Sequence, residues 1–194
     1  MSMELLHKKW GAALWIFFVA VFSRLFPHPS NFTAMQAIAL FGNRWIPSSR
    51  MTWGVLLLAQ FSTDMLIGFY RGFEFVYISL ILTRLCATWV GPIQGCRRSL
   101  GWGFLSCVGF FLLSNFGCWW KGDLYSQDMR GLLACYAAAL PFFLNHILGT
   151  VFYALGLERL SMAVKPKQQK SQISSQRAVV WCTHYITVIP PLHT

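Results

Sequence analysis

Long apolar segments constrain this chain more than any other feature of its sequence. Six can be delimited, at about 10–26, 33–46, 51–70, 75–91, 100–120 and 131–157. A helix that crosses a bilayer needs roughly 20 apolar residues, within a range of about 17–25. Most of the segments approach that length, but the segment at 33–46 is short, so it either crosses a locally thinned bilayer or is re-entrant. The pattern predicts an all-α, polytopic membrane protein with six transmembrane helices.

The charged residues support this interpretation and exclude a soluble domain. Only 11% of the residues are charged and 56% are hydrophobic, whereas soluble domains carry about 25% charged residues. If the chain crosses six times from a cytoplasmic N-terminus, eleven Lys and Arg residues lie inside and four outside. This positive-inside bias predicts that both termini are cytoplasmic. It also explains the net charge of +10 by topology and contact with the lipid bilayer, without a nucleic-acid partner.

The two ends of the chain differ from its middle. Residues 1–9 have the basic character of a cytoplasmic N-terminus, and the apolar run after them lacks the small-residue cleavage site of a secretory signal, so we expect an uncleaved first helix. Residues 158–194 are basic and polar, which predicts a flexible cytoplasmic tail that contacts lipid headgroups. The six-helix membrane domain is therefore expected at 10–157, in the inner (plasma) membrane.

Polar residues within the apolar segments mark a candidate site, because ionisable groups are costly inside a bilayer. At about 1.5 Å per residue, Arg24, Asp64 and Asn115 lie roughly 20–22 Å from the inner face, with Arg84 just beneath them. One interpretation is structural: Asp64 and Arg84 form an ion pair, and Arg24 extends to the outer headgroups. The other is a polar pocket that opens outward.

The loop at 24–32 lies above this layer and would roof such a pocket. Its prolines limit its freedom, and we expect His28 and Asn31 to face the opening. Trp119 and Trp120 stand at the same outer end, where they either stack on a ligand or belong to the interfacial aromatic belt. The candidate substrate-binding residues are Arg24, His28, Asn31, Asp64, Arg84, Asn115, Trp119, Trp120 and Tyr136.

Other chemistry is not indicated by the sequence. Asn145 and His146 fall in the inner half of the last segment, where an interhelical hydrogen bond is the expected role. The six cysteines are scattered and form no CxxC pair, so neither a disulfide framework nor a metal site is predicted. No GxSxG, HExxH or Walker motif is present, so we expect no enzyme activity and no cofactor.

Four runs resemble a known group of proteins: FPHPSNFTAMQAIALFGNRW, FSTDMLIGFY, LSNFGCWW and GLLACYAAALPFFLNHILGTVFY. Over about residues 20–157 the chain resembles a family of uncharacterised bacterial inner-membrane proteins that is similar to the S components of energy-coupling factor (ECF) transporters. The resemblance implies a six-helix, S-component-like bundle with an outward-facing small-molecule site. It also implies a separate coupling subunit and ATPases. S components carry an Ala-x-x-x-Ala docking pattern on the first helix, which Ala12, Ala13 and Ala20 do not form.

Two functions follow from these observations. The first is uptake of a small solute, in which Arg24, Asp64 and Asn115 contact the polar parts of the ligand. The second is a non-transporting membrane partner or assembly protein, in which the same residues are structural.

Overall fold

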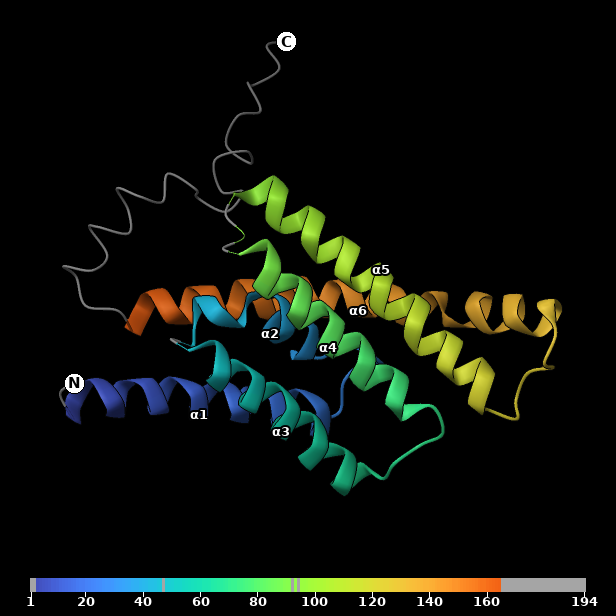
Figure 1. The fold of residues 1–194 in the computed structure, drawn as a ribbon, viewed down its shortest axis with the longest axis horizontal. Coiled ribbons are helices and arrows are strands. Elements are labelled where there is room, and N and C mark those ends of the chain that lie inside the picture. The colour runs from blue at the N-terminus through green and yellow to red at the C-terminus, as the bar shows by residue number, and fades with distance from the viewer. Residues whose placement is uncertain (1–2, 47, 92, 94, 165–194) are drawn as a thin grey trace, which may run out of the picture.

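The computed structural model describes residues 3–46, 48–91, 93 and 95–164; the remainder of the predicted tail, 165–194, lies outside them. These residues form six α-helices and one 3-10 turn, and no strand occurs within them (Figure 1). The elements are α1 (Met3–Leu25), α2 (Met35–Phe41), η1 (Gly42–Arg44), α3 (Ser49–Ile67), α4 (Phe73–Val90), α5 (Cys96–Lys121) and α6 (Met129–Val164). Every predicted apolar segment contains a helix, which confirms the all-α class.

Successive helices run back and forth along the long axis of the molecule (Figure 1). We call the end where α1 begins and α6 ends the terminal end. The opposite end, with the α3–α4 loop at 68–72 and the α5–α6 loop at 122–128, is the hairpin end. α1, α3 and α5 run toward the hairpin end, and α2, α4 and α6 run back. The helices α1 and α3 pack together, as do α4 with α5 and α5 with α6.

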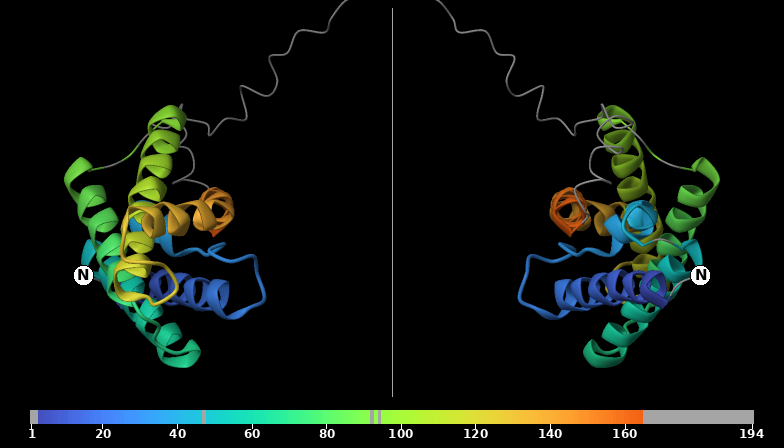
Figure 2. Two further views of the ribbon diagram at one scale, coloured as in Figure 1. Left: turned by 90° about the vertical axis from the view of Figure 1, so that its right-hand side faces the viewer. Right: turned by 90° about the vertical axis from the view of Figure 1, so that its left-hand side faces the viewer.

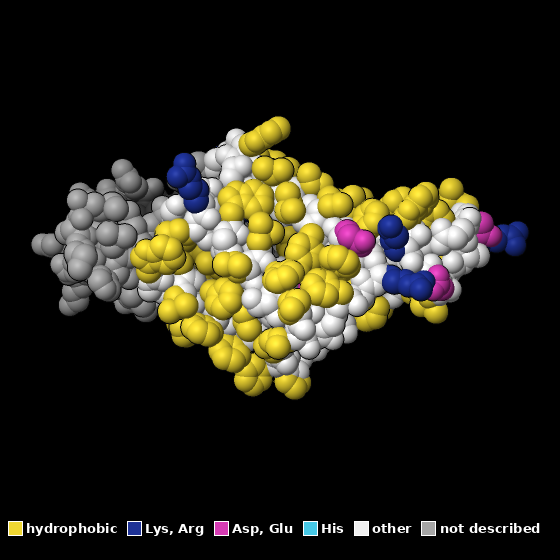
Figure 3. All heavy atoms as spheres, turned by 60° about the horizontal axis from the view of Figure 1, so that its bottom comes forward, with side chains coloured by type: hydrophobic (Ala, Val, Ile, Leu, Met, Phe, Trp, Pro, Cys, Tyr) yellow, Lys and Arg dark blue, Asp and Glu magenta, His cyan; other side chains and the backbone are white. Residues whose placement is uncertain are grey.

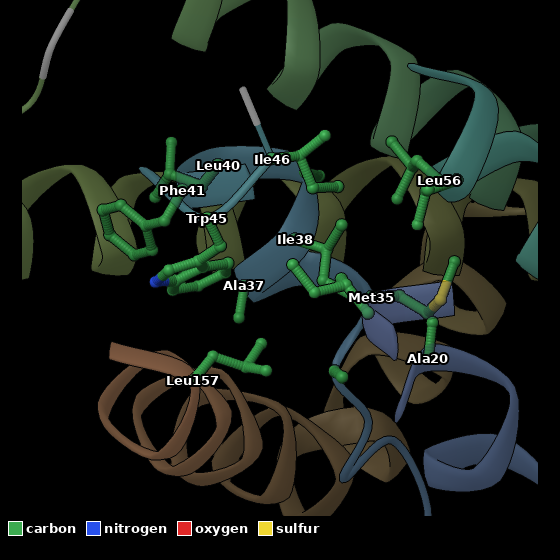
Figure 4. Close-up of a cluster of buried hydrophobic side chains, with 14 of the residues drawn as sticks. Ala20, Met35, Ala37, Ile38, Leu40, Phe41, Trp45, Ile46, Leu56 and Leu157 are labelled. Atoms are coloured by element: carbon green, nitrogen blue, oxygen red, sulfur yellow. The ribbon is translucent and has the colours of Figure 1, made fainter. Parts of the chain in front are cut away.

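The short helix α2 occupies the centre of the bundle. All seven of its residues are buried, and it packs against α3, α4, α5 and α6. Figure 4 shows its side chains Met35 and Ile38 in one apolar cluster with Leu56 of α3 and Leu157 of α6. A helix of this length rises only about 10 Å, against a hydrocarbon core of about 30 Å. The segment 33–46 therefore contains a buried helix about a third as long as the core is thick, and it is not a regular spanning helix.

The last helix is longer than the sequence predicted. α6 continues to Val164, and Glu158, which is buried, accepts a hydrogen bond from the indole nitrogen of Trp45 at 3.1 Å. The helix therefore extends beyond residue 158, where the sequence predicted the start of the tail. The N-terminal residues from Met3 onward are likewise helical.

The distribution of polar and apolar side chains is compatible with a membrane protein. Figure 3 shows one face of the molecule, whose middle is covered by hydrophobic side chains. Most of the charged side chains on this face lie in the right half of the view. The buried set includes many polar groups, such as Gln36, Gln60, Asp64, Arg84 and His146. Among the described helices, three, α4, α5 and α6, are long and apolar enough to cross a membrane. The apolar part of α1, Trp10–Leu25, is shorter.

Candidate functional site

A buried polar cluster joins α1 to α3 near the hairpin end. Arg24 lies in the last turn of α1, and Gln60 and Asp64 lie one turn apart on the buried face of α3. The Arg24 guanidinium contacts one carboxylate oxygen of Asp64. It also donates a 2.6 Å hydrogen bond to the side-chain amide oxygen of Gln60. Gln60 in turn donates to the other Asp64 oxygen at 2.9 Å. Asp64 is only 1% exposed and Arg24 is 15% exposed, so the carboxylate of this charge pair is desolvated and the guanidinium is partly so.

One hydrogen-bond donor of this cluster, Nε of Arg24, has no partner among the described residues. The hydroxyl of Tyr77 on α4 adds a polar group beside the cluster and interacts with the Asp64 carboxylate. Buried donors are nearly always satisfied in native proteins. The cluster can therefore accept one more polar group, with Nε of Arg24 as the donor that is still free.

Tyr70, in the loop that joins α3 to α4, adds an aromatic ring beside the cluster. Burial of its hydroxyl and the nearby negative charge of Asp64 raise the pKa of Tyr70 to about 12, although the charge of Arg24 acts in the opposite direction. The phenol therefore stays protonated at neutral pH and remains a hydrogen-bond donor.

The loop between α1 and α2 runs outward and returns toward the centre of the bundle between α1 and α6 (Figure 2). The ring nitrogens of His28 lie 2.7 and 3.3 Å from the carbonyl oxygens of Pro29 and Arg24. Asn31 has a positive φ of 67°, a conformation that Asn tolerates better than most residues. His28 and Asn31 thus shape the loop, and within the described residues neither side chain is hydrogen-bonded to Asp64 or Gln60.

This loop borders an open apolar groove between α1 and α6, with a volume of about 510 Å³. The groove is lined by Trp15, Phe18 and Phe22 of α1, by loop residues that include His28, and by Tyr153 of α6. Its lining is almost entirely aromatic and aliphatic. The loop therefore lies beside an apolar surface as well as next to the end of α1 that carries Arg24.

His146 of α6 is a buried polar residue for which the sequence predicted an interhelical hydrogen bond. It is stacked on Phe110 of α5, with ring centroids 4.5 Å apart, and its Nε2 has no hydrogen-bond partner among the described residues. The backbone of Asn31 lies within reach of its ring. One turn later, Gly149 allows the loop backbone at Phe32 to approach α6 closely. The histidine thus faces the α1–α2 loop, a contact that position along a helix does not predict.

Arg84 lies outside the Arg24–Asp64 cluster. Its guanidinium donates to the side-chain oxygens of Asn43 at 2.6 Å and Ser49 at 2.8 Å, and Ser49 is the first residue of α3. Arg84 is therefore near the terminal end, and the expected Asp64–Arg84 ion pair is wrong. The sequence placed Arg84 too close to the layer of Asp64. The residue lies only about 9 Å from the end of α4 at Val90.

The remaining predicted site residues lie on the α5–α6 pair and bond within it. Asn115 donates to the Phe111 carbonyl one turn earlier at 2.7 Å, and Tyr136 donates to the Leu112 carbonyl at 2.7 Å. The Trp119 indole donates to the Ser126 carbonyl at 2.8 Å. Trp120 is 57% exposed. Among the described residues, no hydrogen bond joins this group to Arg24, Gln60 or Asp64.

The fold and the site define an all-helical protein with apolar helices compatible with a membrane and with polar groups buried between them. Within the described residues, no group of three or more His, Cys, Asp or Glu side chains could hold a metal ion.

The chain belongs to a family of unknown function, DUF6580, whose sequence profile matches residues 4–172. This confirms the expectation of an uncharacterised family. Neither the curated proteins nor the solved structures include a match to the chain.

Proposed function

We propose that this chain is a multi-pass protein of the inner (plasma) membrane that binds a small polar solute at its hairpin end, similar to an S component of an ECF transporter. The proposal includes a cytoplasmic terminal end. That end carries Arg50, Arg97, Arg98 and Arg159 with one acidic neighbour, Glu158, whereas at the hairpin end basic Arg71, Lys121 and Arg130 are offset by acidic Glu74, Asp123 and Asp128. An excess of Lys and Arg marks the cytoplasmic side of a membrane protein.

One observation carries the proposal: the Arg24–Gln60–Asp64 cluster is largely buried and still has an unpartnered donor, Nε of Arg24. An ion pair inside an apolar bundle is costly to desolvate, and intramembrane ionisable residues commonly mark substrate pathways. The cluster lies in the half of the bundle that faces outward in the proposed orientation. It is thus positioned to receive a solute from outside the cell.

The cluster also indicates the chemistry of the ligand. A guanidinium and a carboxylate lie side by side, so a ligand with both donor and acceptor groups fits better than a simple anion or a hydrocarbon. The phenol rings of Tyr70 and Tyr77 add flat apolar area and two hydroxyl donors. Such a combination of apolar walls and a few convergent polar groups is typical of small-molecule sites.

Active uptake would need other subunits. The sequence has no nucleotide-binding motif, so a separate coupling subunit and ATPases would have to supply the energy, as they do for S components. The first helix lacks the usual Ala-x-x-x-Ala docking pattern. A partner would therefore bind through a different surface of this chain.

The proposal is tested by screening polar vitamins, precursors and amino acids for thermal stabilisation of the purified protein in detergent. We expect a ligand that raises the Tm of the natural protein, and we expect Asp64→Asn and Tyr77→Phe to abolish that rise. Asn115→Ala is the matched control, because Asn115 bonds only within its own hairpin, and its variant should respond like the natural protein. Stabilisation that survives Asp64→Asn combined with Tyr77→Phe would place the ligand elsewhere.

The alternative function, a non-transporting membrane partner or assembly protein, is favoured by a specific feature of the same cluster. Arg24, Gln60 and Asp64 bond to one another, as a purely structural link between α1 and α3 would. If no solute in the screen raises the Tm and the cluster variants only lose stability, this alternative is preferred.

A further inference from the structure

Arg84 has no negatively charged partner within the part of the chain that the structure describes. Its side chain is 0% exposed, and its Nε and Nη1 atoms have no hydrogen-bond partner among the described residues. The side chains of five of the six Asp and Glu residues are described, and none of these five forms an ion pair with Arg84. A buried guanidinium without an anion is strongly unfavourable, so this arrangement needs an explanation.

The first turn of α3, which Arg84 contacts, adds partial positive charge beside the guanidinium. Its Nη2 donates to the Ser49 hydroxyl in the first turn of α3, where the helix dipole places a partial positive charge. The first backbone hydrogen bond of α3 runs from Thr52 to Ser48, and Ser48 makes no side-chain capping bond. The amides of residues 49–51 therefore have no partner within the helix.

These donors are close to the molecular surface. Ser49 and Asn43, which bond directly to Arg84, are both exposed, and so is Arg50 in the same turn. A ligand that reaches Ser49 would therefore need to displace only one layer of side chains to contact the guanidinium. The ring of Trp53 lies beside the guanidinium of Arg84, with its centroid 5.9 Å from the guanidinium carbon.

We propose that Arg84 and the first turn of α3 form a binding site for a phosphate group. The donors available are Nε and Nη1 of Arg84 and the backbone amides of the turn, and a phosphate has enough oxygens to accept from several at once. Arg50 adds a second positive charge. The phosphate belongs either to a lipid headgroup at the terminal end or to a free ion in solution.

Thermal unfolding of the purified protein in detergent distinguishes these sources. One arm compares dioleoylphosphatidylglycerol with dioleoylglycerol, which lacks the phosphate, in mixed micelles. The other compares sodium phosphate with sodium chloride at equal ionic strength. We expect phosphatidylglycerol, phosphate or both to raise the Tm by roughly 5 °C near saturation. A rise with the lipid alone assigns the site to a headgroup, and a rise with both assigns it to phosphate chemistry in general.

The variant Ser49→Glu tests the location of the site. Its carboxylate would lie where Arg84 now meets a hydroxyl, so it should raise the Tm without any added ligand and remove the response to phosphate. In the double variant Ser49→Glu with Arg84→Gln, that gain in Tm should disappear. The single variant alone suffices if Arg84→Gln fails to fold. The proposal is overturned if neither probe exceeds its control, or if Ser49→Glu responds as strongly as the natural protein.

Discussion

Arg24 and Asp64, 40 residues apart in the sequence, form an ion pair between the end of α1 and the last turns of α3. Gln60 bonds to both partners, so the three side chains form one closed arrangement. The pair lies among apolar helices and connects α1 to its main neighbour, α3. It is consequently both a candidate ligand contact and a determinant of how α1 is held.

Removing either partner of the pair should destabilise the protein. Asp64→Asn leaves the Arg24 guanidinium without its counter-charge, and a buried pair broken on one side typically costs about 3–5 kcal/mol. Because Arg24 is partly exposed, we expect the lower end of that range. The measurement is the free energy of unfolding in micelles by titration with sodium dodecyl sulfate.

The double variant Arg24→Gln with Asp64→Asn completes that experiment. It should lose less stability than the sum of the two single variants, by about 1–3 kcal/mol, because neither charge is then left unpaired. Additive losses would show that the two side chains do not interact in the folded protein.

Close packing of the α1–α2 loop against α6 predicts that replacing two glycines of that helix by alanine changes the free energy of unfolding very differently. A methyl group at Gly149 would lie 3.0 Å from Cα of Phe32 and 3.1 Å from N of Thr33, so Gly149→Ala must displace backbone and should cost about 1–3 kcal/mol. Gly156→Ala meets nothing within 4 Å and should be neutral or gain up to about 1 kcal/mol from helix propensity. Unfolding free energies of the two variants check this, and equal effects would contradict the contact.

Asp128 predicts a pH effect at the start of α6. Its carboxylate accepts hydrogen bonds from the Gly131 amide at 2.7 Å and the Ser126 hydroxyl at 2.8 Å, and these bonds lower the pKa of Asp128 below its ordinary value of 3.8. A lowered folded-state pKa means that the stabilisation is complete above 3.8 and is lost as the pH falls through the folded value.

Comparison with Asp128→Asn isolates this contribution. Asn also caps helices but does not titrate, so the Tm of the natural protein should exceed that of the variant at pH 6 by more than at pH 3. The Tm of both proteins across this range is the measurement. A constant difference would show that the Asp128 carboxylate does not take part in the pH dependence.

The proposed orientation predicts which loops react from outside the cell. In a cysteine-free background, Asp123→Cys at the hairpin end should be labelled in intact cells by a membrane-impermeant maleimide. Arg97→Cys at the terminal end should be labelled only after the cells are opened. Both positions are exposed, so accessibility to solvent is matched. Labelling of Arg97→Cys in intact cells would invert the topology.

The apolar segments determined the helices. Each helix satisfies its backbone within a single segment, so local composition suffices to predict it, and all six segments contain one. The sequence also placed Arg24 and Asp64 at a common depth, because the rise per residue is fixed. Gln60 was detectable in principle, since it lies one turn before Asp64 on the same face.

Only the tertiary structure decided which side chains meet. Depth along a helix says nothing about lateral neighbours, so Arg84, Asn115 and Tyr136 were grouped with Asp64 although they bond elsewhere. The burial of α2 in the centre, and the contact of His146 with the α1–α2 loop, likewise depend on packing between segments far apart in the chain. The sequence by itself determined the helices and the polar residues they carry; the packing of α1 on α3 selected Arg24 as the partner of Asp64.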